Sequence, residues 1–205
     1  MIRLYDYWRS SASYRVRIAL GLAGLNWGRV SIDLANGEQQ GPDYLARNPH
    51  GLVPVLEIDG RTLSQSLAII EYLNETRGLG LLPADPLARA TVRALAYDVA
   101  MDIHPVCNLR VARHAVAQSG GALTMDSWMA TFIGPGLAAL ERQVGPGDVC
   151  FGSDVTLADL CLAPQLYNAR RWNIDLAPLP KLRRIEAHLA TIPAFAAAHP
   201  DHFKP

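Results

Sequence analysis

The chain has 205 residues and a mass of 22.3 kDa, enough for one large domain or two small ones, and half of its residues are hydrophobic. Nineteen basic residues balance nineteen acidic ones, which argues against a nucleic-acid surface and against a polybasic membrane patch. Three cysteines without a close pair argue against a disulfide framework and a zinc site. The start MIRLYDYW resembles no charged leader, and no apolar run reaches membrane-spanning length. We therefore expect a cytoplasmic protein without nucleic-acid or membrane partners.

Strand and helix patterns alternate over residues 1–75. Apolar residues that alternate with polar ones define the expected strands, and apolar residues with helical spacing define the expected helices. Strands are expected at 2–7, 30–34, 53–58 and 61–63, and helices at 11–24 and 64–75. Asp59-Gly60 lies between the last two strands and predicts a hairpin turn.

The second part of the chain has a helical pattern throughout. Residues 76–86, TRGLGLLPADP, carry two glycines and two prolines, which is typical of an interdomain linker. Helices are expected at 87–117, 124–143, 156–170 and 179–196. The predicted architecture is an α/β domain at 1–78 followed by an all-helical domain at 86–205.

Two segments with serines precede helices in the α/β part. Ser10 and Ser11 follow the first strand, and Gln65-Ser66 opens the last helix. Serines at such positions usually cap the helix; the alternative is an anion held by helix N-terminal amides and hydroxyls. The segments contain no glycine-rich phosphate pattern, which disfavours a dinucleotide site or a P-loop.

Pro54 directly follows Val53 at the start of a predicted strand. Proline removes a ladder donor, so it is common in edge strands. The alternative is a cis Val53-Pro54 bond beside a ligand. The spacing alone favours the ordinary edge residue.

The segment at 7–20, YWRSSASYRVRIAL, resembles the signature of zeta-class glutathione transferases, which include maleylacetoacetate and maleylpyruvate isomerases. The resemblance spans essentially the whole chain, through QSLAIIEYLNE at 65–75, LLPADP at 81–86, DIHPVCNLR at 102–110, TLADLCLAPQ at 156–165 and NARRWNIDLAP at 168–178. It implies a thioredoxin-like βαβββα-type domain followed by the all-helical glutathione-transferase domain. One position departs from the signature: Ala12 stands where the signature usually has cysteine. Similar bacterial maleylpyruvate isomerases also lack this cysteine, so catalysis is not expected to need that thiol.

The resemblance implies glutathione as the cofactor. Its contacts are assigned to Gln65 and Ser66 for the γ-glutamyl end, Val53 and Pro54 for the cysteinyl backbone, Gln39 for the glycyl end, and Ser10 or Ser11 for the thiol. Amides at a helix start together with a hydroxyl donor favour the thiolate over the thiol. Ser10 is the first candidate for this activation and Ser11 the second.

The resemblance also implies a maleyl dicarboxylate substrate, whose anionic groups need cations. Arginine suits them because its planar fork binds carboxylates bidentately. The matching positions are Arg9, Arg110 and Arg171, the last with Arg170 as a neighbouring rival.

His104 and Asn108 match DIHPxxN segments of bacterial relatives and are expected to contact cofactor and substrate. They are four residues apart, so they would share one face of the expected long helix. Pro105 between them would distort that helix locally.

The implied reaction is the glutathione-dependent isomerisation of maleylacetoacetate to fumarylacetoacetate in aromatic amino acid catabolism. Alternatives are maleylpyruvate isomerisation in the gentisate pathway, glutathione transfer to small α-halo acids, and a non-catalytic glutathione-binding scaffold. The presence of both Ser10 and Arg9 argues against the scaffold. The family is generally homodimeric, so a homodimer is expected here. Thr156 and Asp159 form a capping-box pattern, and Asp159 is expected to be structural.

Overall fold

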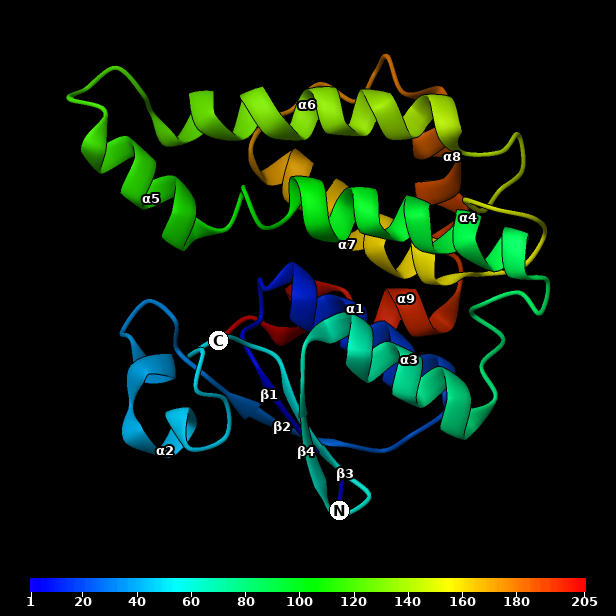
Figure 1. Ribbon diagram of the computed structural model, residues 1–205, viewed down its shortest axis with the longest axis horizontal. Helices are drawn as coiled ribbons and strands as arrows, with labels where there is room; N and C mark the ends of the chain where they lie inside the picture. The colour runs from blue at the N-terminus through cyan, green and yellow to red at the C-terminus, as the bar shows by residue number, and fades with distance from the viewer. The chain divides into compact units, whose positions relative to one another are not determined.

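The computed structural model describes all 205 residues, which form two compact units (Figure 1). The first contains Met1–Gly80 together with Ile192–Pro205, and the second contains Leu81–Thr191. The predicted fold class is confirmed, with a sheet and helices in the first unit and helices alone in the second. The expected boundary at 86–205 differs in one respect: residues 192–205 pack with the first unit.

A four-stranded mixed sheet in the order β2-β1-β3-β4 forms the base of the first unit. Its strands are β1 (Arg3–Asp6), β2 (Gly28–Ser31), β3 (Val55–Ile58) and β4 (Arg61–Ser64). β1 runs parallel to β2 and antiparallel to β3. The hairpin between β3 and β4 turns at Asp59 and Gly60, both with positive φ, as a two-residue turn of this kind requires.

The helices α1 (Ser11–Leu22) and α3 (Ser66–Arg77) pack side by side in the first unit, and α9 (Pro193–Ala197) packs against α1 (Figure 1). Gly21 permits this approach, because a Cβ there would lie 3.1 Å from the Cβ of Ala194. The short helices η1 (Glu38–Gln40), α2 (Pro42–Leu45) and η3 (Pro200–Phe203) complete the unit.

The second unit is entirely helical. Its elements are α4 (Pro86–Tyr97), the π-helix η2 (Asp98–Ile103), α5 (Leu109–Gln118), α6 (Met125–Gln143), α7 (Leu157–Arg171) and α8 (Pro180–Leu189). α7 packs against α4 and α8, and α5 packs against α6. None of the helices in the chain has the length and apolar character needed to cross a membrane.

The prediction of one helix over 87–117 is wrong. The chain widens into η2 after Tyr97, where the N–H of His104 donates to the carbonyl of Val99, five residues back, at 2.9 Å. Pro105 follows and has no N–H to continue the helix, so α5 starts anew at Leu109. π-helical turns of this kind are frequent at functional sites.

The prediction of one helix over 179–196 is also wrong, because α8 ends at Leu189. Ile192 is extended, with φ −80° and ψ 123°, as the residue before a proline prefers. Pro193 then starts α9, which belongs to the first unit.

The capping box at the start of α7 is present. The carboxylate of Asp159 is fully buried and accepts the N–H groups of Thr156 at 2.7 Å and Cys150 at 2.8 Å, and the Thr156 hydroxyl at 2.9 Å. Asp159 therefore joins the loop before α7 to its first turn.

Candidate active site

Three loops leave the sheet of the first unit at the same end. Tyr5 of β1 pairs with Val55 of β3, and Val55 pairs with Ser64 of β4. The end of β1, the start of β3 and the end of β4 are therefore neighbours. The segments that follow or precede them contain most of the predicted site residues of this unit, so the sheet register brings those residues to one edge.

The loop after β1 places Ser10 and Ser11 at the start of α1. Ser10 is the N-cap: its Oγ accepts the N–H of Ser13 at 3.2 Å, and its N–H donates to the carbonyl of Tyr7 at 2.9 Å. Capping uses a lone pair of the hydroxyl, so its proton can still be donated to a ligand. Ser11 is the first helical residue and is 8 % exposed. A thiolate at this end would meet the Ser10 hydroxyl and the positive end of the helix dipole.

Arg9 lies against the two aromatic residues that precede it. Its guanidinium carbon is 4.7 Å from the centroid of the Trp8 ring, and its Nη2 donates to the Tyr7 hydroxyl at 3.0 Å. The Nε of Arg9 is buried and has no hydrogen-bond partner in the chain. Arg9 is thus a cation with an unused donor, as an anionic substrate group needs.

The Val53-Pro54 bond is cis, so the prediction of an ordinary edge proline is wrong. Pro54 lies directly before β3, which is an inner strand between β1 and β4. No hydrogen bond within the chain involves the N–H or carbonyl of Val53. An extended peptide backbone could pair with both groups, as a strand does when it adds to a sheet.

The carbonyl immediately before Val53 is held firmly. Leu52 accepts the hydroxyl of Tyr44 at 2.8 Å and the side-chain amide of Asn48 at 2.7 Å. Burial raises the pKa of Tyr44 well above its usual value, which keeps the hydroxyl protonated as a donor. Neither Tyr44 nor Asn48 was predicted from the sequence, because a pair of donors that clamps a neighbouring carbonyl leaves no local pattern.

The start of α3 has the character of an anion site. Gln65 has φ 69° and ψ 111°, which non-glycine residues rarely adopt, and its side chain caps no amide of the helix. The first amides of α3 are therefore directed at the space before the helix. The Oγ of Ser66 accepts a hydrogen bond from Nη1 of the buried Arg15 at 3.3 Å, which adds a positive charge beside this helix start.

Arg15 is a third residue of this region that was not predicted from the sequence. Its signal was present, because α1 carries arginines at positions 15 and 17 among apolar residues of a helix whose central turns are buried. Buried arginines are rare and need specific partners. Gln39 lies in η1, where its Oε1 is buried without a partner in the chain.

Two predicted residues of the second unit flank the break after η2. His104 follows the π-helix, and Asn108 is the N-cap of α5, where its Oδ1 accepts the N–H of Arg110 at 3.0 Å. They do not share a helix face, so this expectation is wrong; the break at Pro105 separates them. Arg110 is exposed in the first turn of α5.

Arg170 and Arg171 end α7 and have different partners. Nε of Arg170 donates to Oε1 of Glu186 in α8 at 3.0 Å, whereas Nη1 of Arg171 donates to Oδ1 of the buried Asn168 at 3.0 Å. Arg170 is therefore engaged in a carboxylate pair.

Comparison with known proteins shows which family has this arrangement. Models of the glutathione S-transferase N-terminal and C-terminal domains match residues 1–75 and 133–191. The maleylacetoacetate isomerase of Rhizobium meliloti (strain 1021) is 59 % identical over 98 % of this chain and 97 % of its own. The chain belongs to the glutathione S-transferase family. More narrowly, it falls among the maleylacetoacetate and maleylpyruvate isomerases of the zeta class, which confirms the resemblance seen in the sequence.

Two solved structures of glutathione transferases are similar to this member of the family over nearly its full length. One is a holo maleylpyruvate isomerase, described as a bacterial glutathione transferase of the zeta class, with a TM-score of 0.91 and 40 % identity over 97 % of this chain and 96 % of that one. The other is a maleylacetoacetate isomerase from Methylobacterium extorquens AM1 with bound malonate and glutathione, with a TM-score of 0.92 and 41 % identity over 99 % and 98 %.

Proposed function

We propose that this zeta-class glutathione transferase is a glutathione-dependent cis–trans isomerase that converts maleylacetoacetate to fumarylacetoacetate. The observation that carries the proposal is the meeting, at one edge of the sheet, of a helix start with a donor hydroxyl, an open Val53 peptide and a second helix start suited to an anion. Three such features fit the thiol, backbone and carboxylate of a tripeptide. The names of the relatives supply the reaction.

Each part of glutathione has a matching group in the first unit. Gln65 and Ser66 at the start of α3 bind the γ-glutamyl carboxylate, helped by Arg15 at Ser66. The Val53 peptide pairs with the cysteinyl backbone, and Gln39 lies at the glycyl end. Glutathione, when bound, supplies the thiolate that adds reversibly to the cis double bond of the maleyl group.

The side chains around the reaction have separate roles. Ser10 donates its proton to the thiolate, with Ser11 as the second candidate. Arg9 binds one carboxylate of the substrate and stabilises the negative charge that develops on it. From the second unit, Arg110 and Arg171 are proposed for the other anionic group, and His104 and Asn108 for further polar contacts with substrate and cofactor.

We expect Tyr44→Phe to weaken glutathione binding about fivefold, equivalent to about 1 kcal/mol for one hydrogen bond. The change removes one of two donors to Leu52 and loosens the adjoining Val53 peptide. Titration calorimetry measures the Kd. Tyr72→Phe is the matched control, because its hydroxyl contacts Asp59 in the hairpin at 2.6 Å. An equal Kd in both variants would show that the hydrogen bond from Tyr44 to Leu52 does not support glutathione binding.

Thiol alkylation is expected to leave the isomerase activity intact. Burial raises the pKa of Cys107 to about 11 and that of Cys150 well above its usual value, so the reactive thiolates of these two residues are scarce at neutral pH; Cys161 is buried away from the reagent. The protein is treated with iodoacetamide, desalted and assayed with fresh glutathione. Ala12→Cys puts a thiol in the first turn of α1 and is expected to become sensitive. Rapid inactivation of the unaltered chain would show a reactive native cysteine.

We also propose a homodimer in the cytoplasm, in keeping with the family resemblance. Leu87 in α4 and Met101 in η2 are 77 % and 55 % exposed, and a second copy of the chain would cover such apolar side chains. Light scattering should give twice the 22.3 kDa chain mass. Leu87→Arg should shift the protein towards monomers; a monomeric unaltered chain would contradict the proposal.

The substrate is tested by measuring the isomerisation of maleylacetoacetate and maleylpyruvate side by side. We expect a higher kcat/KM for maleylacetoacetate. A ratio in favour of maleylpyruvate would place the chain in the gentisate pathway instead. If neither maleyl substrate is turned over but halide is released from small α-halo acids, the protein is a transferase. If glutathione binds and no substrate is turned over, the protein is a scaffold.

A further inference from the structure

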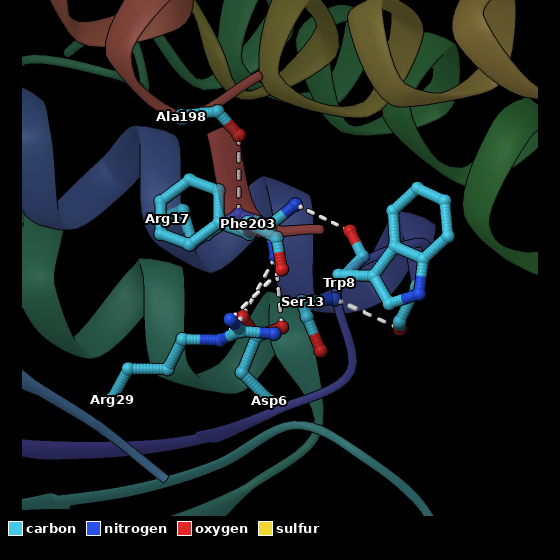
Figure 2. A network of polar contacts seen from close by, with 8 residues as sticks. Asp6, Trp8, Ser13, Arg17, Arg29, Ala198 and Phe203 are labelled. Atoms are coloured by element: carbon cyan, nitrogen blue, oxygen red, sulfur yellow. Dashed lines mark hydrogen bonds and ion pairs between the residues drawn. The ribbon is translucent and has the colours of Figure 1, made fainter. Parts of the chain in front are cut away.

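Arg17 is a buried cation with no part in the proposed chemistry. Its side chain is fully buried in α1 and contacts three separate segments of the first unit (Figure 2). Nη1 donates to both oxygens of Asp6 at 2.8 Å, Nη2 donates to the carbonyl of Trp8 at 3.1 Å, and Nε donates to the carbonyl of Ala198 at 3.1 Å. One guanidinium thus joins the end of β1, the loop before Ser10 and the C-terminal segment.

The C-terminal segment is fixed to the same cluster by Phe203. Its ring lies 4.4 Å from the guanidinium carbon of Arg17 and stacks on Trp27 with centroids 6.0 Å apart. Arg29 extends from β2 and donates to the carbonyl of Phe203 at 2.9 Å and to Asp6 at 3.1 Å. Residues 198–203 are therefore held by Arg17 of α1, Arg29 of β2 and Trp27.

Stability alone does not account for this network. A buried ion pair is often no more stabilising than apolar residues of similar size, because burial removes the hydration of both charges. Its hydrogen bonds, however, have fixed directions and so define positions. The position defined here is the carbonyl of Trp8, which lies between β1 and the two residues proposed to bind substrate and thiol, Arg9 and Ser10.

We propose that the C-terminal segment, residues 198–203, positions the loop at 7–10 through Arg17, with Arg29 and Phe203 as further positioning residues. This inference rests on the proposed function for its effect on activity, but its structural part does not. Loosening the segment changes the surroundings of Arg17, which in turn releases the Trp8 carbonyl. The loop then no longer holds Ser10 and Arg9 in the productive geometry.

The test uses the full chain with Arg29→Met, Phe203→Leu and the conservative Phe203→Tyr. Arg17 is left unchanged, because its removal would take away the cation that binds both oxygens of the buried Asp6 and the donors to the carbonyls of Trp8 and Ala198, and so could prevent folding. Arg77→Met is the matched control: the Arg77 side chain is 27 % exposed against 25 % for Arg29, and it pairs with Asp59 in the same unit. Hydrogen exchange of the peptide that contains residues 7–13 is the first readout.

We expect amide exchange in this peptide to rise about tenfold or more in Arg29→Met and Phe203→Leu, and to stay unchanged in Phe203→Tyr and Arg77→Met. The N–H of Ser10, which donates to Tyr7, reports on the loop directly. Faster exchange confined to residues 198–205 would overturn the inference. The exchange measurement does not depend on turnover, so a failure of this inference can be told apart from a failure of the proposed function.

The second readout is the thiol pKa of bound glutathione, followed by thiolate absorbance against pH. We expect it to rise in the two loosening variants and not in the two controls, with kcat/KM falling about fivefold or more. A loss of thermal stability with an unchanged thiol pKa and unchanged loop exchange would assign the network to stability alone.

Discussion

Ser10→Ala is expected to lower kcat/KM for the glutathione-dependent isomerisation about 100-fold, equivalent to about 2.7 kcal/mol of lost stabilisation of the reacting charge. The hydroxyl of Ser10 accepts one hydrogen bond as the cap of α1 and retains a proton for the thiolate. Without it, the bound thiol should ionise at a higher pH. The checks are kcat/KM and the pH at which thiolate absorbance appears.

The cap complicates Ser10→Ala, since its loss alone lowers the free energy of unfolding by about 1 kcal/mol. Thermal unfolding must therefore be measured on the same samples. Ser13→Ala is the matched control: the Ser13 hydroxyl is buried without a partner in the chain, so its removal should leave activity unchanged. If Ser10→Ala keeps full activity and Ser11→Ala loses it, the thiol is activated by Ser11; if both keep it, the amides of α1 suffice.

Arg9→Ala is expected to raise KM for the maleyl substrate and to lower kcat/KM between about 100-fold and 1,000-fold. Arg9 lies against Trp8 and the Tyr7 hydroxyl with one buried donor unused. Its removal should leave a substrate carboxylate without a charged partner. Arg9→Lys keeps the charge but not the planar fork, so it should recover only part of the loss.

The control for Arg9 is Arg61→Ala, an exposed arginine of β4 at the hairpin end of the sheet. It changes the net charge equally and should not alter kcat/KM. Glutathione affinity should also stay near its original value in Arg9→Ala, because Arg9 is assigned to the other substrate. An unchanged kcat/KM in Arg9→Ala would remove this residue from the anion site.

Local patterns predicted the first unit well. The hairpin at Asp59-Gly60 and the start of α1 depend on turn and capping chemistry within a few residues, which the sequence contains. Strand ends were less accurate, because pairing partners set them: Ile32 and Leu34 alternate like strand residues but lie beyond the end of β2 at Ser31.

Long-range contacts account for what the sequence did not reveal. The return of residues 192–205 to the first unit depends on Arg17, whose partners Ala198 and Phe203 are distant in sequence. In the second unit, Pro105 was expected to distort a long helix, whereas it ends one helix rather than bending it. The clamp of Tyr44 and Asn48 on Leu52 likewise appears only once the chain is folded.

For the candidate site, family resemblance supplied the residues, and the sheet register explains why the three segments proposed to bind glutathione lie at one edge. The physical reason for assigning ligands to these segments is that each has polar groups without partners in the chain. These groups are the Val53 peptide, Nε of Arg9 and the first amides of α3. Sequence patterns cannot show an unpaired group, since pairing is decided by the fold.

The groups at this sheet edge are proposed to bind glutathione so that its thiol performs the isomerisation. The most direct test compares glutathione with S-methylglutathione, which keeps the tripeptide and blocks the sulfur, at concentrations that saturate the protein. We predict binding of both, turnover of maleylacetoacetate with glutathione only, and competitive inhibition by the methylated form. Equal turnover with S-methylglutathione, or with no glutathione at all, would contradict the account.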